Sequence, residues 1–326
     1  MTDVLTPGAS PSTTPLTRPN AYTRVRDPCD ALSDGLRGAL RRVTAQQDAS
    51  ALRKLREAAA LLAEHRMDAC LYHLIHEAAR DTRHYSSRHS LLSALIAETA
   101  AKVLGWPAAE VQALSMAALS MNVGMCDLQD QLAQSDRPLN AEMRVRIARH
   151  ADDGRRLLAE AGVDDEAWLE AVSLHHSPPP EGVTLADLST GARLAALLRR
   201  VDIFTAKLSR RGTRQPMSPV KAAGQACLGA NGQPDELGAA LLKSLGLYPP
   251  GSLVQLQGGE MAIVAKRGAR VDQPWVAVLV APDGIPCLRP LLRDTGQANF
   301  TVKSAAAASA LTWRPAHEVI LEISSR

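Results

Sequence analysis

The sequence HSLLSALIAETAAKVLGWPAAEVQALSMAALSMNVGM (residues 89–125) contains two helical patterns in direct succession. Over residues 92–103 apolar side chains return at three- and four-residue spacing, and the sequence Gly-Trp-Pro then ends the helix. Residues 108–121 repeat the spacing, after which Gly124 permits a tight exit. Two amphipathic segments joined by so short a turn predict helices that pack against each other at the centre of a helical fold.

Composition supports a mainly α protein with more than one domain. The chain of 326 residues is long enough for about two domains, each with its own core. Apolar residues make up 46% of the sequence but aromatic residues only 3%, so Ala, Leu and Val must fill the core, which favours packed helices. The 37 basic and 34 acidic residues are mixed along the chain and give a net charge of +3, and only residues 199–214 approach a basic cluster. We therefore expect no DNA binding.

The cysteines and the apolar runs indicate a reducing compartment. The five cysteines are scattered and form no Cys-x-x-Cys pair, which argues against a disulfide framework and against a zinc knuckle. No window of about 18 uninterrupted apolar residues occurs, and the first residues lack the pattern of a signal peptide. We expect a cytoplasmic protein without membrane insertion.

Shifts in composition divide the chain into four parts. Residues 1–30 combine repeated prolines with Ser, Thr and Gly, which predicts a disordered N-terminal tail. Residues 31–84 have helical spacing and are expected to form N-terminal helices, and residues 85–246 continue as a helical domain. Residues 247–326 change to short β-type runs separated by Gly- and Pro-containing turns, which predicts a small antiparallel β module and a tail, with residues 319–323 as one further strand. We expect this module to cover the helices or to mediate a homodimer.

Within the helical domain, five side chains offer metal-ligand chemistry: His89, His150, His175, His176 and Asp202. Imidazole nitrogens and carboxylate oxygens suit zinc, iron and manganese, and only a helical fold could gather ligands that lie so far apart in the sequence. Adjacent residues of a helix point about 100° apart, so we expect His175 and His176 to serve neighbouring ions, or one ion and a phosphate. Alternatively, each histidine packs in the core and makes ordinary hydrogen bonds.

The order and spacing of these residues resemble the HD-GYP branch of the HD phosphohydrolase superfamily. The resemblance covers roughly residues 85–245. It implies an all-helical domain that binds two or three metal ions, usually iron or manganese, and hydrolyses cyclic di-GMP to linear pGpG or GMP. The elements that carry it are His89-Ser90, Val123-Gly124, His150 with Gly154, His175-His176, Val201-Asp202-Ile203-Phe204, Arg211 to Arg214, and Ser218-Pro219.

The resemblance also implies a role for each candidate ligand. His89 and Asp202 would bind one ion, and His150 and His175 would bind a second. His176 lies where the family places a further ligand. All five residues are therefore expected to contribute to one metal centre.

The phosphate-binding residues and the central motif differ in how well they fit the family. Arg211 and Arg214 would face the substrate phosphates, a role that suits a guanidinium fork. Where the family has His-Asp-Ile-Gly-Lys, however, this chain has Met121, Asn122, Val123, Gly124 and Met125. The family's aspartate bridges the ions and its lysine helps to bind phosphate. A thioether and a neutral amide are poor substitutes for an imidazole and a bridging carboxylate.

Three functions are compatible with this pattern. The first is a signalling protein with a degenerate centre, which acts by binding a cyclic dinucleotide or a protein partner. The second is an active phosphodiesterase with an atypical centre that holds iron, manganese or zinc at reduced occupancy. The third is a structural scaffold without metal. The first is favoured because the bridging carboxylate, the Gly-Tyr-Pro signature and a second aspartate, replaced by Thr205, are all lost. Loss of the bridging carboxylate alone should cost a few powers of ten in rate, at about 1.4 kcal/mol for each power of ten.

Overall fold

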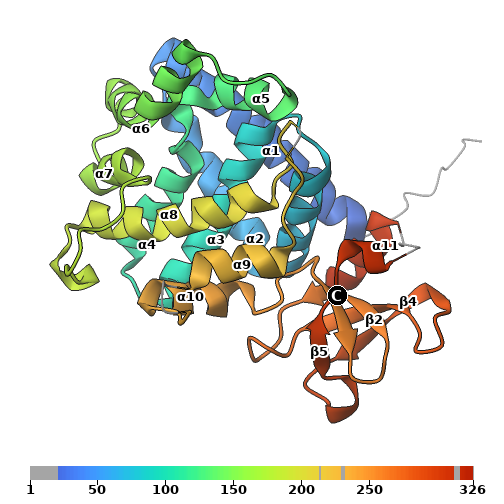
Figure 1. Cartoon of the computed structure of the whole chain (residues 1–326). Coiled ribbons are helices and arrows are strands. Elements are labelled where there is room, and N and C mark those ends of the chain that lie inside the picture. Colours follow the sequence, from blue (N-terminus) through green and yellow to red (C-terminus); the bar gives the residue numbers. More distant parts are fainter. Residues whose placement is uncertain (1–20, 213, 229–231, 312–315, 326) are drawn as a thin grey trace, which may run out of the picture.

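The structure is a computed structural model that describes residues 21–212, 214–228, 232–311 and 316–325. Helices dominate the chain up to residue 245, and a five-stranded antiparallel sheet follows (Figure 1). The predicted fold class, a helical domain followed by a small antiparallel β module, is confirmed. Among the described residues, no helix combines the length and the apolar character needed to cross a membrane. The helices of the first part are α1 (Ala21–Gln46), α2 (Ser50–Arg80), α3 (Tyr85–Val103), α4 (Ala108–Ser120), η1 (Val123–Met125), α5 (Cys126–Gln134), α6 (Ala141–Glu160), α7 (Glu166–Leu174), η2 (Leu185–Asp187), α8 (Thr190–Leu208), α9 (Pro219–Cys227) and α10 (Glu236–Leu245).

The N-terminal region is more ordered than its proline content suggests. The expected tail over residues 1–30 is wrong for residues 21–30, which belong to α1, while residues 1–20 lie outside the described residues. Val25 and Cys29 are buried against the core, and this burial offsets the ordering entropy that the composition alone emphasises. The next helix, α2, bends at Arg66, where the backbone leaves helical geometry (φ −145°, ψ 31°).

Helix α3 is central because its small side chains let neighbouring helices approach it from several sides. It begins after His84, whose backbone is left-handed (φ 55°). Helices α1, α2, α4, α8 and α10 all pack against it. The amphipathic pattern of residues 92–103 therefore predicted the helix but understated its burial. The small buried residues of α3 are Ser86, Ser87, Ser90, Ser93, Ala94, Ala97, Ala100 and Ala101.

The sheet has the strand order β4-β3-β2-β1-β5, and every neighbouring pair is antiparallel. The predicted strand at residues 319–323 is wrong, because these residues lie in α11. Ile320, Leu321 and Ser324 are buried at three- and four-residue spacing, which is the pattern of a helix face. The elements of this part are β1 (Leu253–Leu256), β2 (Met261–Lys266), β3 (Trp275–Val280), β4 (Pro286–Asp294), η3 (Ala298–Phe300), β5 (Val302–Ala305), η4 (Ala308–Ala310) and α11 (His317–Ser324).

One face of the sheet contributes to the core of the helices. Ala265, Ala277 and Leu279 belong to the same cluster of buried side chains as the helices, and α11 packs on α1, α2 and β2. The opposite face carries a smaller apolar cluster that includes Val264 and Val278. In Figure 1 the sheet lies beside the helices, with α11 above it. The sheet and the helices therefore bury apolar surface against each other.

Candidate metal centre

Helix α6 carries His150 into the core, and Gly124 of η1 allows η1 to approach this part of α6 closely. Asn140 caps α6, and its side-chain oxygen accepts a hydrogen bond of 2.8 Å from the backbone N–H of Met143. A Cβ atom on Gly124 in η1 would lie 2.5 Å from the backbone oxygen of His150. Only glycine permits this contact, so residue 124 determines how closely η1 approaches the turn of α6 that carries the histidine.

The pair His175 and His176 lies just beyond the end of α7. The last residue of this helix is Leu174, and His175 caps it. The ring centres of the two histidines are 4.1 Å apart and the ring planes are inclined by 42°. The two rings thus approach each other, although side chains of adjacent helical residues point about 100° apart, and His176 lies in the turn that follows the helix.

The hydrogen bonds of His150 and His175 determine which ring nitrogens carry protons. His150 Nδ1 lies 2.6 Å from the carbonyl oxygen of Ile147, and His175 Nδ1 lies 2.6 Å from that of Val172. Since a carbonyl can only accept, both Nδ1 atoms donate. Burial lowers the pKa of His150, and it lowers the pKa of His175 to about 3, so both rings are neutral near pH 7. Both Nε2 atoms consequently carry lone pairs.

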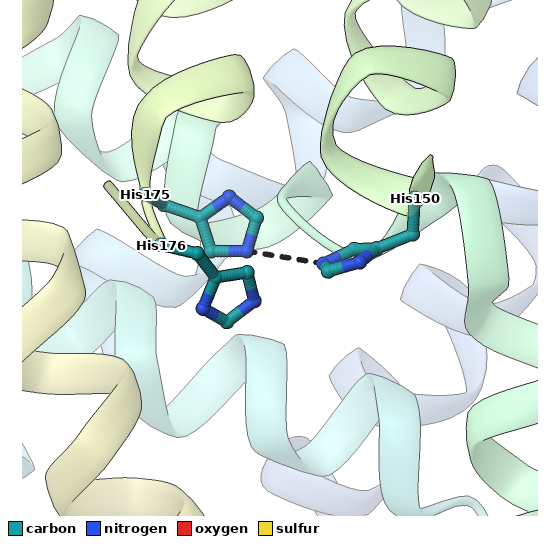
Figure 2. A group of neighbouring side chains, drawn as sticks. All are labelled: His150, His175 and His176. Atoms are coloured by element: carbon teal, nitrogen blue, oxygen red, sulfur yellow. Dashed lines mark hydrogen bonds between the residues drawn. The ribbon is translucent and has the colours of Figure 1, made fainter. Parts of the chain in front are cut away.

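These two lone pairs face each other in a site that fits a metal ion. His150 Nε2 and His175 Nε2 are 3.3 Å apart with no proton available to either. Two nitrogens bound to one ion at about 2.0–2.1 Å lie about 3.4 Å apart in tetrahedral geometry and about 2.9 Å in octahedral geometry. His176 is exposed, but its ring nitrogen is within 4.8 Å of the ligand atoms of the other two. Figure 2 shows the three rings turned toward one space, His150 from one side and the pair from the other.

His89 and Asp202 form a second pair in the same region. His89 Nε2 lies 2.9 Å from Asp202 Oδ1, and the histidine side chain is buried. Burial pushes the pKa of Asp202 upward, but the hydrogen bond from His89 and the nearby His175 and His176 pull it well below its usual range. The carboxylate is therefore ionised at neutral pH. The structure thus brings all five predicted ligands into two adjacent groups.

The altered motif lies at the end of α4. Met121 is fully buried in the apolar core, and Met125 donates its backbone N–H to the carbonyl of Asn122 at 2.9 Å. The Asn122 side chain is also buried, and its amide nitrogen has no hydrogen-bond partner among the described residues. Thr205 bonds within its own helix and contacts Ser93 at 3.0 Å. None of these positions offers a carboxylate that could bridge two ions.

Arg211 and Arg214 face each other across a tight hairpin beside α3. The backbone N–H of Arg214 donates to the carbonyl of Arg211 at 2.7 Å. The Arg211 guanidinium lies 4.6 Å from the ring centre of Tyr85 and donates to its hydroxyl. Tyr85 stacks on His89, with ring centres 5.4 Å apart. Arg211 thus adjoins the centre, while Arg214 is exposed and donates to a backbone carbonyl of α8.

Tyr85 is a further residue of the site that was not predicted from the sequence. Burial raises the pKa of Tyr85 to about 12, so its hydroxyl stays protonated. It lies one helical turn before His89, and an aromatic residue at that spacing was the available signal. A separate group of potential ligands, formed by His73, Glu77 and His317, lies outside this centre and was also missed.

Comparisons with known proteins bear on the family and the fold. Residues 73–231 match the family model described as HD domain. A curated relative from Pseudomonas aeruginosa, named cyclic di-GMP phosphodiesterase, is 24% identical over 237 residues, which span 70% of this chain and 56% of the relative. The chain thus spans about half the length of that relative. A solved HDG"Y"P protein from Bdellovibrio bacteriovorus has a TM-score of 0.50 at 16% identity, over 71% of this chain and 73% of that protein, which is a likeness of fold.

Proposed function

The chain carries an HD domain at residues 73–231, consistent with the HD-GYP branch, and from this premise we propose that it is a regulatory relative of those enzymes. In this proposal it holds one divalent metal ion and binds a nucleotide of the cyclic di-GMP class without rapid hydrolysis. The bound nucleotide, rather than a product, is then the signal that the protein passes on.

The observation that carries the proposal is the pair of facing lone pairs. His150 Nε2 and His175 Nε2 are 3.3 Å apart, and each ring is fixed by a hydrogen bond from its other nitrogen to a backbone carbonyl. Metal-binding histidines are oriented in this way, and a cation between the rings would remove the repulsion between the lone pairs. With His176 as a third ligand, iron, manganese or zinc fits this set. When bound, such an ion would supply Lewis acidity toward a phosphate oxygen.

One feature argues against rapid turnover. The position of the bridging carboxylate is taken by Asn122, a neutral residue whose buried amide nitrogen has no partner among the described residues. A centre with a single ion has lost the arrangement that activates water and stabilises both oxygens of a displacement.

The positive charges beside the centre favour an anionic ligand. Partial desolvation and the positive charge of the neighbouring Arg211 lower the pKa of Arg214. The buried Nε atom of Arg211 has no hydrogen-bond partner within the described part of the chain. A phosphate group between the two side chains would relieve the repulsion and accept charge-assisted hydrogen bonds.

Calorimetric titration of the full chain with cyclic di-GMP, with and without Mn²⁺, tests the proposal. We expect binding that Mn²⁺ strengthens, and a loss of about tenfold in affinity for Arg214→Ala, as for one charge-assisted contact. Arg210→Ala is the matched control, because this exposed neighbour precedes the hairpin, and it should retain the affinity. Chromatography of the same samples should detect no linear product beyond the rate without enzyme. Absence of nucleotide binding would refute the nucleotide role.

A second candidate, an active phosphodiesterase, is favoured by the three convergent histidines. In that case the samples with Mn²⁺ would form pGpG or GMP, and His150→Ala would abolish both the product and the bound metal. Robust hydrolysis that depends on His150 would therefore replace the regulatory proposal with this one.

A further inference from the structure

Two helices from opposite ends of the chain meet at a pair of histidines. Helix α2 carries His73 and, one turn later, Glu77, so both side chains lie on the same face. Helix α11 begins with His317, whose Nε2 atom lies 3.0 Å from Nδ1 of His73. Ligand atoms of all three residues lie within 4.8 Å of one another. The segments are far apart in sequence but juxtaposed by the packing of α11 on α2.

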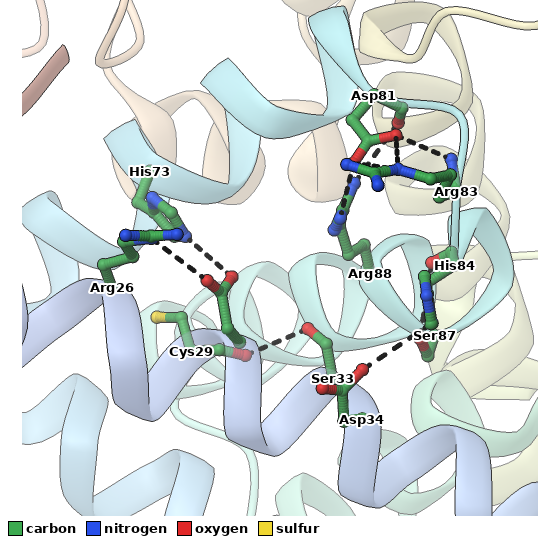
Figure 3. A network of polar contacts seen from close by, with 11 residues as sticks. Arg26, Cys29, Ser33, Asp34, His73, Asp81, Arg83, His84, Ser87 and Arg88 are labelled. Carbon is green, nitrogen blue, oxygen red and sulfur yellow. Dashed lines mark hydrogen bonds and ion pairs between the residues drawn. The ribbon is translucent and has the colours of Figure 1, made fainter.

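A carboxylate on α1 fixes the orientation of His73. Asp30 Oδ1 lies 3.3 Å from His73 Nε2, and Arg26 holds the other oxygen of the same carboxylate at 3.4 Å. Figure 3 shows the side chains of His73 and Arg26 close together. An ionised carboxylate only accepts hydrogen bonds, so Nε2 of His73 donates, and in the neutral ring Nδ1 presents its lone pair toward His317. The carboxylate–histidine–metal arrangement of known metal sites uses the same order of groups.

The ring of His317 is also held in place. It stacks on His76 with ring centres 3.9 Å apart and on Tyr72 at 5.2 Å. These contacts restrict the rotation of the ring, so less conformational entropy remains to be lost when its nitrogen binds a ligand. The two histidines are therefore positioned by different partners, one by a hydrogen bond and the other by stacking.

The group borders a cavity between the helices and the sheet. The cavity has a volume of about 720 Å³, and Glu77 and His317 line it together with residues of β2 and β3 such as Ile263 and Leu279. His73 does not line it and is buried behind the other two. An ion held by the three side chains would thus have protein on one side and open space on the other.

We propose that His73, Glu77 and His317 form a second metal site, for a divalent transition-metal ion such as Zn²⁺, separate from the centre of the HD domain. Two imidazoles and one carboxylate suit such an ion, and a fourth position open to the cavity would take water or a small anionic ligand. The observed separation of 3.0 Å between the two nitrogens lies between the values of about 2.9 Å and about 3.4 Å expected at octahedral and tetrahedral angles for bonds of about 2.0–2.1 Å. The ion links α11 to α2.

The test is the metal content of matched variants of the full chain. Protein stripped with a chelator is loaded with Zn²⁺ for elemental analysis and with Co²⁺ for absorption spectra. Glu77→Gln should bind about one equivalent of metal less than the unaltered chain. Glu318 also borders the cavity, and Glu318→Gln should bind as much metal as the unaltered chain. His317→Ala should show the same loss, with His65→Ala, at an exposed histidine of α2, as its control.

The comparison separates this site from the other centre. Metal bound at His150, His175 and His176 contributes equally to the metal content of all four variants. Its presence or absence therefore does not alter the differences in metal content between them. Should His317→Ala fail to fold by circular dichroism, the nearly isosteric Glu77→Gln still gives the answer. Equal metal content in Glu77→Gln and the unaltered chain, an equal loss in the two controls, or no metal in any sample would overturn the proposal.

Discussion

The buried, neutral His175 should make the stability of the metal-free protein depend strongly on pH. Burial lowers the pKa of His175 to about 3, whereas an unfolded histidine titrates near 6.5. Below pH 6.5 the unfolded state therefore binds more protons than the folded state, and stability falls as the pH falls. From pH 7 to pH 5 this one group should remove about 2 kcal/mol from the free energy of unfolding. Its side chain is fully buried, so solvent screening does not reduce the effect.

Urea unfolding followed by circular dichroism, at pH 7 and pH 5 with EDTA, measures this effect. In His175→Asn the amide can still donate to the carbonyl of Val172 but does not titrate. The free energy of unfolding should therefore change between pH 7 and pH 5 by about 2 kcal/mol less than in the unaltered chain. His65→Asn, at an exposed histidine of α2, should leave the difference unchanged. An equal pH difference in His175→Asn and the unaltered chain would refute the assignment of a buried neutral ring.

Three further substitutions address the surroundings of the centre. Gly124→Ala places a Cβ 2.5 Å from the backbone oxygen of His150 and should lower the free energy of unfolding in urea by about 1–3 kcal/mol. In Gly38→Ala the new Cβ has no atom within 4 Å, so this control should not lose stability. Asn122→Asp buries a charge, so the melting temperature of the stripped protein should fall, while the upward shift on adding Mn²⁺ should grow beyond that of the unaltered chain. Asp202→Asn should lower the free energy of unfolding by about 1–3 kcal/mol at pH 7. Because the pKa of Asp202 is lowered on folding, this loss should shrink as the pH falls below about 4. Urea unfolding at pH 7 and pH 3 would detect the change.

Much of the helical fold could be predicted because its signals are local. The periodicity of residues 92–103 and 108–121 depends on neighbours within one or two turns. The disordered tail was predicted to be too long because the proline content does not indicate that Val25 and Cys29 of α1 are buried. Residues 319–323 were predicted as a strand because a short apolar run suits both structures, and only the packing of α11 distinguishes them.

The sequence predicted that the candidate ligands lie close together, and the structure places them so, but their detailed geometry was not predicted. Family order brought His150 and His175 together correctly, since the distance between helices follows from the fold. The relation of His175 to His176 depends on a helix that ends one residue earlier, and helix ends are poorly determined by periodicity. The contact of His73 with His317 spans 244 positions, and no local pattern encodes a meeting of that kind.

The burial of Ala265, Ala277 and Leu279 among the helices has a practical consequence for work on fragments of this chain. If the polypeptide were cut after residue 246, the apolar surface of the helices that the sheet covers would be exposed to water. Such surfaces promote aggregation. Poor behaviour of an isolated HD fragment would then reflect a missing cover and not a defect of its histidines.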